Sequence, residues 1–153
     1  MSYVRAVRQS LLVASVVGCL TMFVACSSNP NLEDPAATGR QLVSEFLTIL
    51  GTEQATGLDA FLAEGFQLQR SDGTGASKAE YLKEHPLVES FTLGDELVAV
   101  QQGDLLTVRW SVVVDETIEG TEFSSDEAPR LSVFVYEDDQ WALLAHANFN
   151  RPA

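Results

Sequence analysis

The order of hydrophobic and polar residues predicts helices in the first half of the chain. A helix is expected over residues 38–50, with Thr38 as a possible N-cap and Gly51 as its stop. Apolar residues recur on one face of this helix at helical spacing, namely Leu42, Phe46, Ile49 and Leu50. A second, shorter helix is expected over residues 53–63, ended by Gly65. Together these patterns predict a helical pair at the start of a folded domain.

The chain after residue 65 alternates as β-strands do. Residues 66–70 alternate apolar and polar, and Ser77 to Glu80 match a capping box that opens a short helix ending before Pro86. Further strands are expected over residues 96–101, 105–117, 131–136 and 141–149. The last two form a hairpin whose turn is the acidic segment 137–140. Because mostly short turns join these strands, an α+β class with a curled antiparallel sheet is predicted.

The first 25 residues have the pattern of a secretory leader. Arg5 and Arg8 precede an uncharged apolar run that is shorter than the roughly 20 residues of a membrane-spanning helix. The run ends in Phe23-Val24-Ala25-Cys26, which resembles the lipobox of bacterial lipoproteins, with Phe23 in place of the usual leucine. A competing lipobox ends at Cys19, but cleavage there leaves a short apolar stretch before it. An uncleaved anchor and a simple secreted protein are the alternatives.

This pattern predicts three parts of the chain. Residues 1–25 are expected to be a signal peptide, 26–37 a lipidated cysteine and flexible tether, and 38–153 one folded domain. Palmitate on Cys26 is then expected to hold the protein in the cell envelope, on the extracytoplasmic side of a bacterial membrane.

Charge and cysteine content narrow the function classes. The leader holds two of the nine basic residues and none of the 22 acidic ones, so the remainder carries seven basic residues against 22. Such a surface repels nucleic acid, and it provides solubility or, alternatively, attracts a cation. Both cysteines lie in or next to the leader, so the domain has no disulfide, thiol nucleophile or thiolate metal site. No cofactor motif is present, and neither a cofactor nor a metal is expected.

Three segments together have the pattern of a known family: the helix pair followed by residues 66–70, the glycine-bearing loop that leads into 77–82, and the ending 133–146 with its tryptophan and histidine. They resemble the NTF2-like superfamily, close to its DUF4440 and SnoaL-like groups. The resemblance implies a cystatin-like cone, in which a strongly curved antiparallel sheet packs on about three helices from the N-terminal half. It also implies a pocket between sheet and helices, and a possible homodimer through the outer face of the sheet.

Candidate site residues come from the strands. Alternation places His146 and Asn148 on one face of the last strand, and the more apolar Trp141, Leu143, Ala145, Ala147 and Phe149 on the better core face. If His146 points inward, it could act as a base with Asn148 as a hydrogen-bond donor; otherwise it is structural. Arg109 and Arg70 are either structural, in an ion pair or facing outward, or binding groups for an acidic ligand at the mouth of the cone. The candidate pocket residues are therefore Arg70, Arg109, Trp110, Tyr136, His146 and Asn148.

Two functions from different classes fit these observations. The first is a non-catalytic envelope lipoprotein whose cone binds a small apolar ligand or a protein partner. The second is a SnoaL-like or ketosteroid-isomerase-like enzyme with His146 as general base and Asn148 or Arg109 steadying a negative charge. The sequence favours the first, because the aspartates lie at loops and strand ends and form no acid–base pair with Tyr81 or Tyr136.

Overall fold

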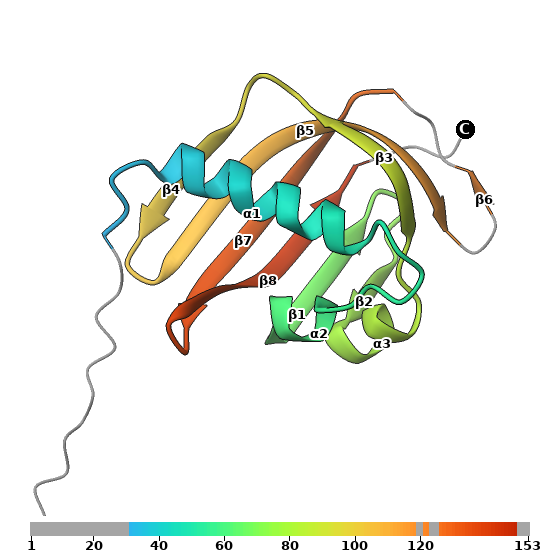
Figure 1. Cartoon of the computed structure of the whole chain (residues 1–153), viewed down its shortest axis with the longest axis horizontal. Helices are drawn as coiled ribbons and strands as arrows, with labels where there is room; N and C mark the ends of the chain where they lie inside the picture. Colours follow the sequence, from blue (N-terminus) through green and yellow to red (C-terminus); the bar gives the residue numbers. More distant parts are fainter. Residues whose placement is uncertain (1–30, 119–120, 123–125, 150–153) are drawn as a thin grey trace, which may run out of the picture.

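The structure, a computed structural model, describes residues 31–118, 121–122 and 126–149. A curled sheet wraps around one long helix, and two short helices close one end of it (Figure 1). The leader, the lipobox and Cys26 lie outside the described residues, so their assignment stays a prediction. Within the described ranges, no helix is long and apolar enough to span a membrane.

The elements of the described part follow in chain order. The helices are α1 (Pro35–Ile49), α2 (Leu58–Phe61) and α3 (Lys78–Lys83). The strands are β1 (Leu62–Arg70), β2 (Gly75–Ser77), β3 (Leu87–Leu93), β4 (Val98–Gln102), β5 (Leu105–Ile118), β6 (Thr121–Glu122), β7 (Ala128–Glu137) and β8 (Gln140–Asn148).

The sheet has the strand order β2-β1-β8-β7-β5-β3, with β4 and β6 also paired to β5. The sheet is mixed, because β1 runs parallel to β8 while the other pairs are antiparallel. The prediction of a wholly antiparallel sheet is therefore wrong at this pair. Short turns force antiparallel pairing only between consecutive strands, and β1 and β8 are far apart in the chain. The α+β class and the curled sheet are confirmed.

Helix boundaries differ from those predicted. Helix α1 begins at Pro35, three residues early, because Asp34 caps it by accepting the Ala37 N–H at 2.9 Å. Helix α2 has only four residues, and Gly65 lies inside β1 rather than ending a helix. The capping box of α3 is confirmed, since the Glu80 carboxylate accepts from the Ser77 backbone N–H at 2.8 Å.

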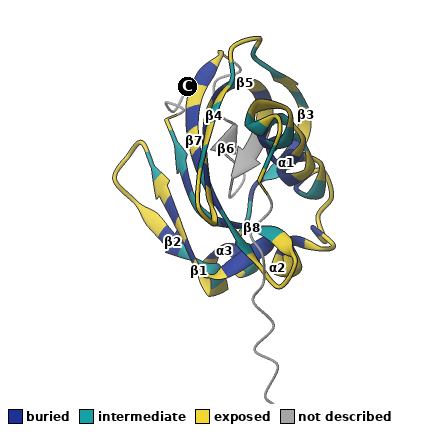
Figure 2. Cartoon of the chain, turned by 90° about the vertical axis from the view of Figure 1, so that its left-hand side faces the viewer, coloured by how far each residue is buried: buried dark blue, intermediate teal, exposed yellow. Residues whose placement is uncertain are grey.

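The core lies between α1 and the concave face of the sheet. Buried side chains of α1 meet alternate residues of β5, among them Val108 and Val112, while the intervening residues face solvent (Figure 2). Phe46 is the centre of an aromatic cluster, with ring centroids 6.0 Å from Phe61 and 6.4 Å from Tyr81. This packing holds the helix in the curl of the sheet.

A β-bulge in β8 decides which way its last residues point. Phe134 of β7 pairs with Leu143, but its neighbour Val133 pairs with Ala145, so Leu144 is an extra residue without a partner. The alternation therefore shifts after Leu143. Trp141 and Leu143 lie on the core face as predicted. Beyond the bulge, His146 and Asn148 line the concave side, while Ala145 and Ala147 lie on the convex side, contrary to the predicted core face.

The terminal hairpin is confirmed. Strands β7 and β8 pair from Arg130 and Asn148 down to Glu137 and Gln140. Asp138 and Asp139 form the connection, both with positive φ, at 50° and 62°. Positive φ at both central residues is typical of the tight turn that matches the twist of paired strands, and aspartate tolerates it.

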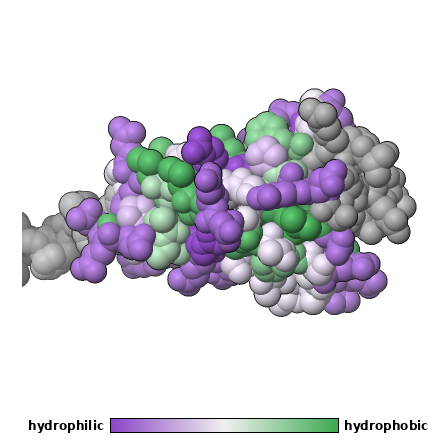
Figure 3. Space-filling view, turned by 90° about the horizontal axis from the view of Figure 1, so that it is seen from above, coloured by the Kyte–Doolittle hydropathy of each residue, from purple (hydrophilic) through white to green (hydrophobic). Residues whose placement is uncertain are grey.

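The surface of the domain carries both hydrophobic and hydrophilic side chains (Figure 3). Seen from above, hydrophilic residues interrupt the hydrophobic ones, so no single hydrophobic patch covers this face (Figure 3). On the convex face, exposed apolar side chains follow three neighbouring strands: Val98 and Val100 of β4, Leu105 of β5 and Leu131 of β7.

Candidate ligand site at the mouth of the sheet

Three strands bring polar side chains together at one end of the concave face. Arg70 ends β1, Asn148 ends β8 and Arg130 lies near the start of β7. Arg70 pairs in register with Asn148, and Asn148 pairs with Arg130, so the three form one row across the sheet. Side chains in such a row point to the same face. We call the small pocket at this end the mouth.

The mouth combines polar and apolar walls. Its polar lining consists of Arg70, Tyr81, Arg130, His146 and Asn148. Its apolar lining consists of Phe46, Leu47, Leu50, Leu68, Pro86 and Val88. The free volume is about 30 Å³, since the aromatic cluster fills the space between α1 and the sheet. A cavity of this size holds a small polar head group, whereas whole drug-sized ligands need roughly 300 Å³ or more.

A hydrogen-bonded chain lies behind the mouth. The Trp110 indole N–H donates to Ser132 Oγ at 3.1 Å, and Ser132 Oγ lies 3.0 Å from His146 Nδ1. In the tautomer with hydrogen on Nε2, the serine hydroxyl donates to Nδ1. All three side chains are buried, and the Phe46 ring packs edge-on against the imidazole at 5.2 Å. These two hydrogen bonds fix the orientation of His146 and satisfy the buried ring nitrogens Nε1 of Trp110 and Nδ1 of His146.

Burial controls the charge of His146. Removal from water and, second, the positive charge of Arg130 lower the pKa of this imidazole to about 3. His146 is therefore neutral at pH 7. A neutral imidazole with so little affinity for protons is a poor general base, because efficient bases have pKa values near the working pH.

Arg130 and Arg70 supply the positive charge of the mouth. Arg130 is only 3% exposed, and its Nη1 donates to the Pro129 carbonyl at 3.2 Å. Arg70 is half-buried, with its Nη1 3.5 Å from Thr74 Oγ1 in the loop between β1 and β2. Asp72 of this loop accepts from the backbone N–H and hydroxyl of Thr74, and these bonds, with a smaller contribution from Arg70, lower its pKa. The Asp72 carboxylate thus finds hydrogen-bond donors within its own loop.

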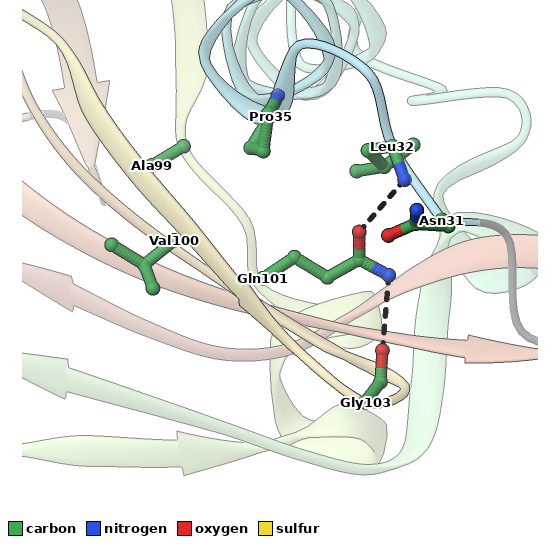
Figure 4. Close-up of a pocket in the computed structure, with 7 residues that line it drawn as sticks. All are labelled: Asn31, Leu32, Pro35, Ala99, Val100, Gln101 and Gly103. Carbon is green, nitrogen blue, oxygen red and sulfur yellow. Dashed lines mark hydrogen bonds between the residues drawn. The ribbon is translucent and has the colours of Figure 1, made fainter.

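A second, larger groove lies at the other end of α1. Its volume is about 440 Å³, and Figure 4 shows its lining: Asn31, Leu32, Pro35, Ala99, Val100, Gln101 and Gly103. Gln101 organises it, accepting the Leu32 N–H at 2.9 Å and donating to the Gly103 carbonyl at 3.0 Å. Among the described residues, no titratable side chain lines this groove.

The structure brings together only some of the predicted site residues. Arg70, His146 and Asn148 line the mouth, and Trp110 lies behind it. Arg109 is exposed on the convex face, paired in register with Val98 and Leu131, because its neighbours Val108 and Trp110 point inward. Tyr136 packs on Trp141 at the opposite end of β7, with centroids 5.3 Å apart. Contrary to the prediction, neither Arg109 nor Tyr136 is among the described residues that line the mouth.

Sequence reasoning missed Tyr81, Arg130 and Ser132 as neighbours of the site. Arg130, Ser132 and Phe134 alternate on the inward face of β7, so the same period-2 pattern contained the signal. Within the described residues, no group of histidine, cysteine or carboxylate side chains could hold a metal ion. The arrangement can fix and hold a polar group. Its hydroxyl–imidazole contact, Ser132 with His146, is a weak nucleophile–base pair, because Ser132 is completely buried and the pKa of the imidazole is lowered to about 3.

The fold was compared with those of known proteins, and the matches are to solved structures. No protein-family model matches the sequence, and no curated protein matches it either. A solved NTF2-like protein from Cytophaga hutchinsonii aligns with a TM-score of 0.67 at 11% identity, over 75% of this chain and 97% of that one. An NTF2-like protein of unknown function in nutrient uptake from Rhodospirillum rubrum aligns at 0.62 with 16% identity, over 77% and 99%.

A third solved structure agrees with these two. An NTF2-like protein with a cystatin-like fold from Novosphingobium aromaticivorans gives a TM-score of 0.54 at 17% identity, over 72% of this chain and 78% of that one. At such identities the likeness concerns the fold, and the closer grouping with DUF4440 or SnoaL-like proteins stays a prediction. The chain has the NTF2-like, cystatin-like fold that its sequence resemblance implied.

Proposed function

We propose that this protein is a lipid-anchored extracytoplasmic binding protein, without catalytic activity, whose ligand enters at the mouth. The observation that carries the proposal is the mouth itself, where five polar side chains converge on a small pocket beside an imidazole held neutral. A neutral, buried and hydrogen-bonded His146 favours binding over the alternative, an isomerase-like enzyme with that residue as general base.

The position of the mouth suits a protein tethered at its N-terminus. Helix α1 begins beside the groove, which Pro35 lines, and ends beside the mouth, which Leu47 and Leu50 line (Figure 1). The helix separates the two by about 22 Å, from its 15 residues and the rise per residue. A lipid on Cys26 would thus hold the opposite end of the domain, leaving the mouth open to solvent.

The anchor is testable by metabolic labelling. In a bacterial host fed labelled palmitate, the full chain is expected to take up label, and Cys26→Ala to lose it, because only Cys26 follows the preferred lipobox. Cys19→Ala is the matched control and should label like the unchanged protein. Label that survives Cys26→Ala but disappears with Cys19→Ala would move the anchor to the competing lipobox.

Native mass spectrometry of the full chain, released from detergent, tests binding and assembly together. We expect a co-purified small molecule that leaves on denaturation.

The same spectrum is expected to show the mass of two chains, since burial of the exposed apolar residues of the convex face (Val98, Val100, Leu105 and Leu131) would stabilise a homodimer. Protein without any bound molecule after gentle purification would count against the ligand, and a monomer mass alone would count against the dimer.

A further inference from the structure

The groove at the start of α1 has a lining that favours an apolar, uncharged occupant. Its apolar walls are Leu32, Pro35, Ala99 and Val100. The Gln101 side chain is hydrogen-bonded at both ends of its amide, to the Leu32 N–H and to the Gly103 carbonyl (Figure 4). The polar groups of this bridge thus already bond one another, and no titratable side chain of the described residues lines the groove with them.

The groove also has the size of a binding site. Its volume of about 440 Å³ falls within the roughly 300–1,000 Å³ of small-molecule pockets. Val100, on its β4 wall, is 61% exposed, the highest value among the exposed large apolar side chains of the described residues. An apolar group lying along this wall would remove that surface from water.

The proposed anchor brings apolar groups close to this groove. Asn31 lines the groove, and Cys26 precedes it by five residues, which an extended chain spans in at most about 18 Å. Acyl chains attached to Cys26 are therefore held within reach of the groove. Such a short link gives them an effective concentration on the order of millimolar, an advantage that no free apolar molecule shares.

We propose that the groove takes up one acyl chain of the lipid on Cys26 while the protein is away from a bilayer. This assignment rests on the anchor proposed above and gives its lipid a second binding place, on the domain itself. Each methylene group removed from water strengthens binding about fourfold, so even an open groove holds part of an acyl chain. A bilayer buries the whole chain, so the acyl group leaves the groove when the protein inserts its anchor.

Photo-cross-linking of the full lipidated chain tests this assignment. Host cells are fed a palmitate analogue with a diazirine at its end, and the purified protein is irradiated both free of detergent and in phosphatidylcholine vesicles. In the detergent-free sample, products with the mass of one chain are expected to carry the analogue on peptides that cover residues 31–35 or 99–103. In vesicles these adducts should fall at least about tenfold, because the bilayer buries the acyl chain instead.

Strand β4 offers a matched pair of variants. Val98→Glu and Val100→Glu place the same charge at exposed positions two residues apart, and of the two only Val100 lines the groove. Val100→Glu is expected to reduce the groove adducts about tenfold or more, because a carboxylate on the wall is costly to cover with an acyl chain. Val98→Glu should leave them unchanged. Both valines belong to the convex face, so an effect through the homodimer would alter the two variants alike.

The outcomes separate this inference from the proposed anchor. If the full chain takes up no labelled palmitate, the anchor fails and the acyl-chain assignment fails with it. If the chain takes up the label but the adducts form outside the groove, or form equally in vesicles, only the acyl-chain assignment is overturned. Equal losses in Val98→Glu and Val100→Glu would show a general effect of charge and would also overturn it.

Discussion

Replacing Phe46 with alanine is expected to lower the free energy of unfolding by about 3–5 kcal/mol. Phe46 is 2% exposed and touches the rings of Phe61, Tyr81 and His146, which belong to α2, α3 and β8. Its removal would leave a cavity at the point where all three helices meet the sheet. Urea unfolding followed by the fluorescence of Trp110 and Trp141 measures the change.

Phe149→Ala is the matched control for this substitution. Phe149 follows the end of β8 and is 46% exposed, so the same replacement should change stability by no more than about 0.5 kcal/mol. Similar losses at both positions would contradict the placement of Phe46 at the centre of the core.

Acidification from pH 7 to pH 5 is expected to lower the free energy of unfolding by about 2 kcal/mol through His146 alone. The folded protein holds this imidazole neutral, with a pKa of about 3, while the unfolded chain protonates it below the ordinary value of 6.5. The unfolded state therefore binds more protons as the pH falls through 6.5, and stability falls with it. The loss continues until the pH reaches the folded pKa.

Other shifted groups act at lower pH. The pKa values of Asp72 and Glu80 lie below 3.8 and 4.5, so their stabilisation is present above those values and is lost only under stronger acid. His146→Leu should therefore flatten the dependence between pH 7 and pH 5, whatever it does to stability at pH 7. A slope unchanged in His146→Leu would contradict the role of this residue.

Local sequence patterns predicted most elements but not the faces of β8. Alternation is a local rule, and it placed Trp141 and Leu143 correctly. One extra residue, Leu144, then shifts the alternation by one position, so that the later residues face the opposite side from the one predicted. Nothing in Leu144 itself signals a bulge. The bulge is set by pairing with β7 and by the parallel partner β1, both non-local. It turns His146 and Asn148 toward the mouth, and this reversal is why the core face was predicted wrongly beyond residue 143.

The candidate site was partly predictable for similar reasons. Arg70 ends its predicted strand, and Asn148 lies one residue before the end of its predicted strand, so both could be expected at an end of the sheet. Their direct pairing depends on the parallel contact of β1 with β8. This contact cannot be predicted from a short turn, because the two strands are not consecutive in the chain. Arg109 was singled out because it interrupts an apolar strand, yet on a strand with one exposed face such a residue points to solvent. Arg130 followed an acidic loop and was overlooked, although its alternation with Ser132 places it inside.

The binding function proposed for the mouth requires His146 to be buried and neutral rather than an acid–base catalyst. Nuclear magnetic resonance of the full chain labelled with ¹⁵N in histidine tests this state, by following the ring nitrogens of His146 as the pH falls from 8 to 5. We expect signals of a neutral imidazole that do not change over this range. A titration of His146 with a midpoint near 6.5 would contradict the account, because it would place the ring in contact with water.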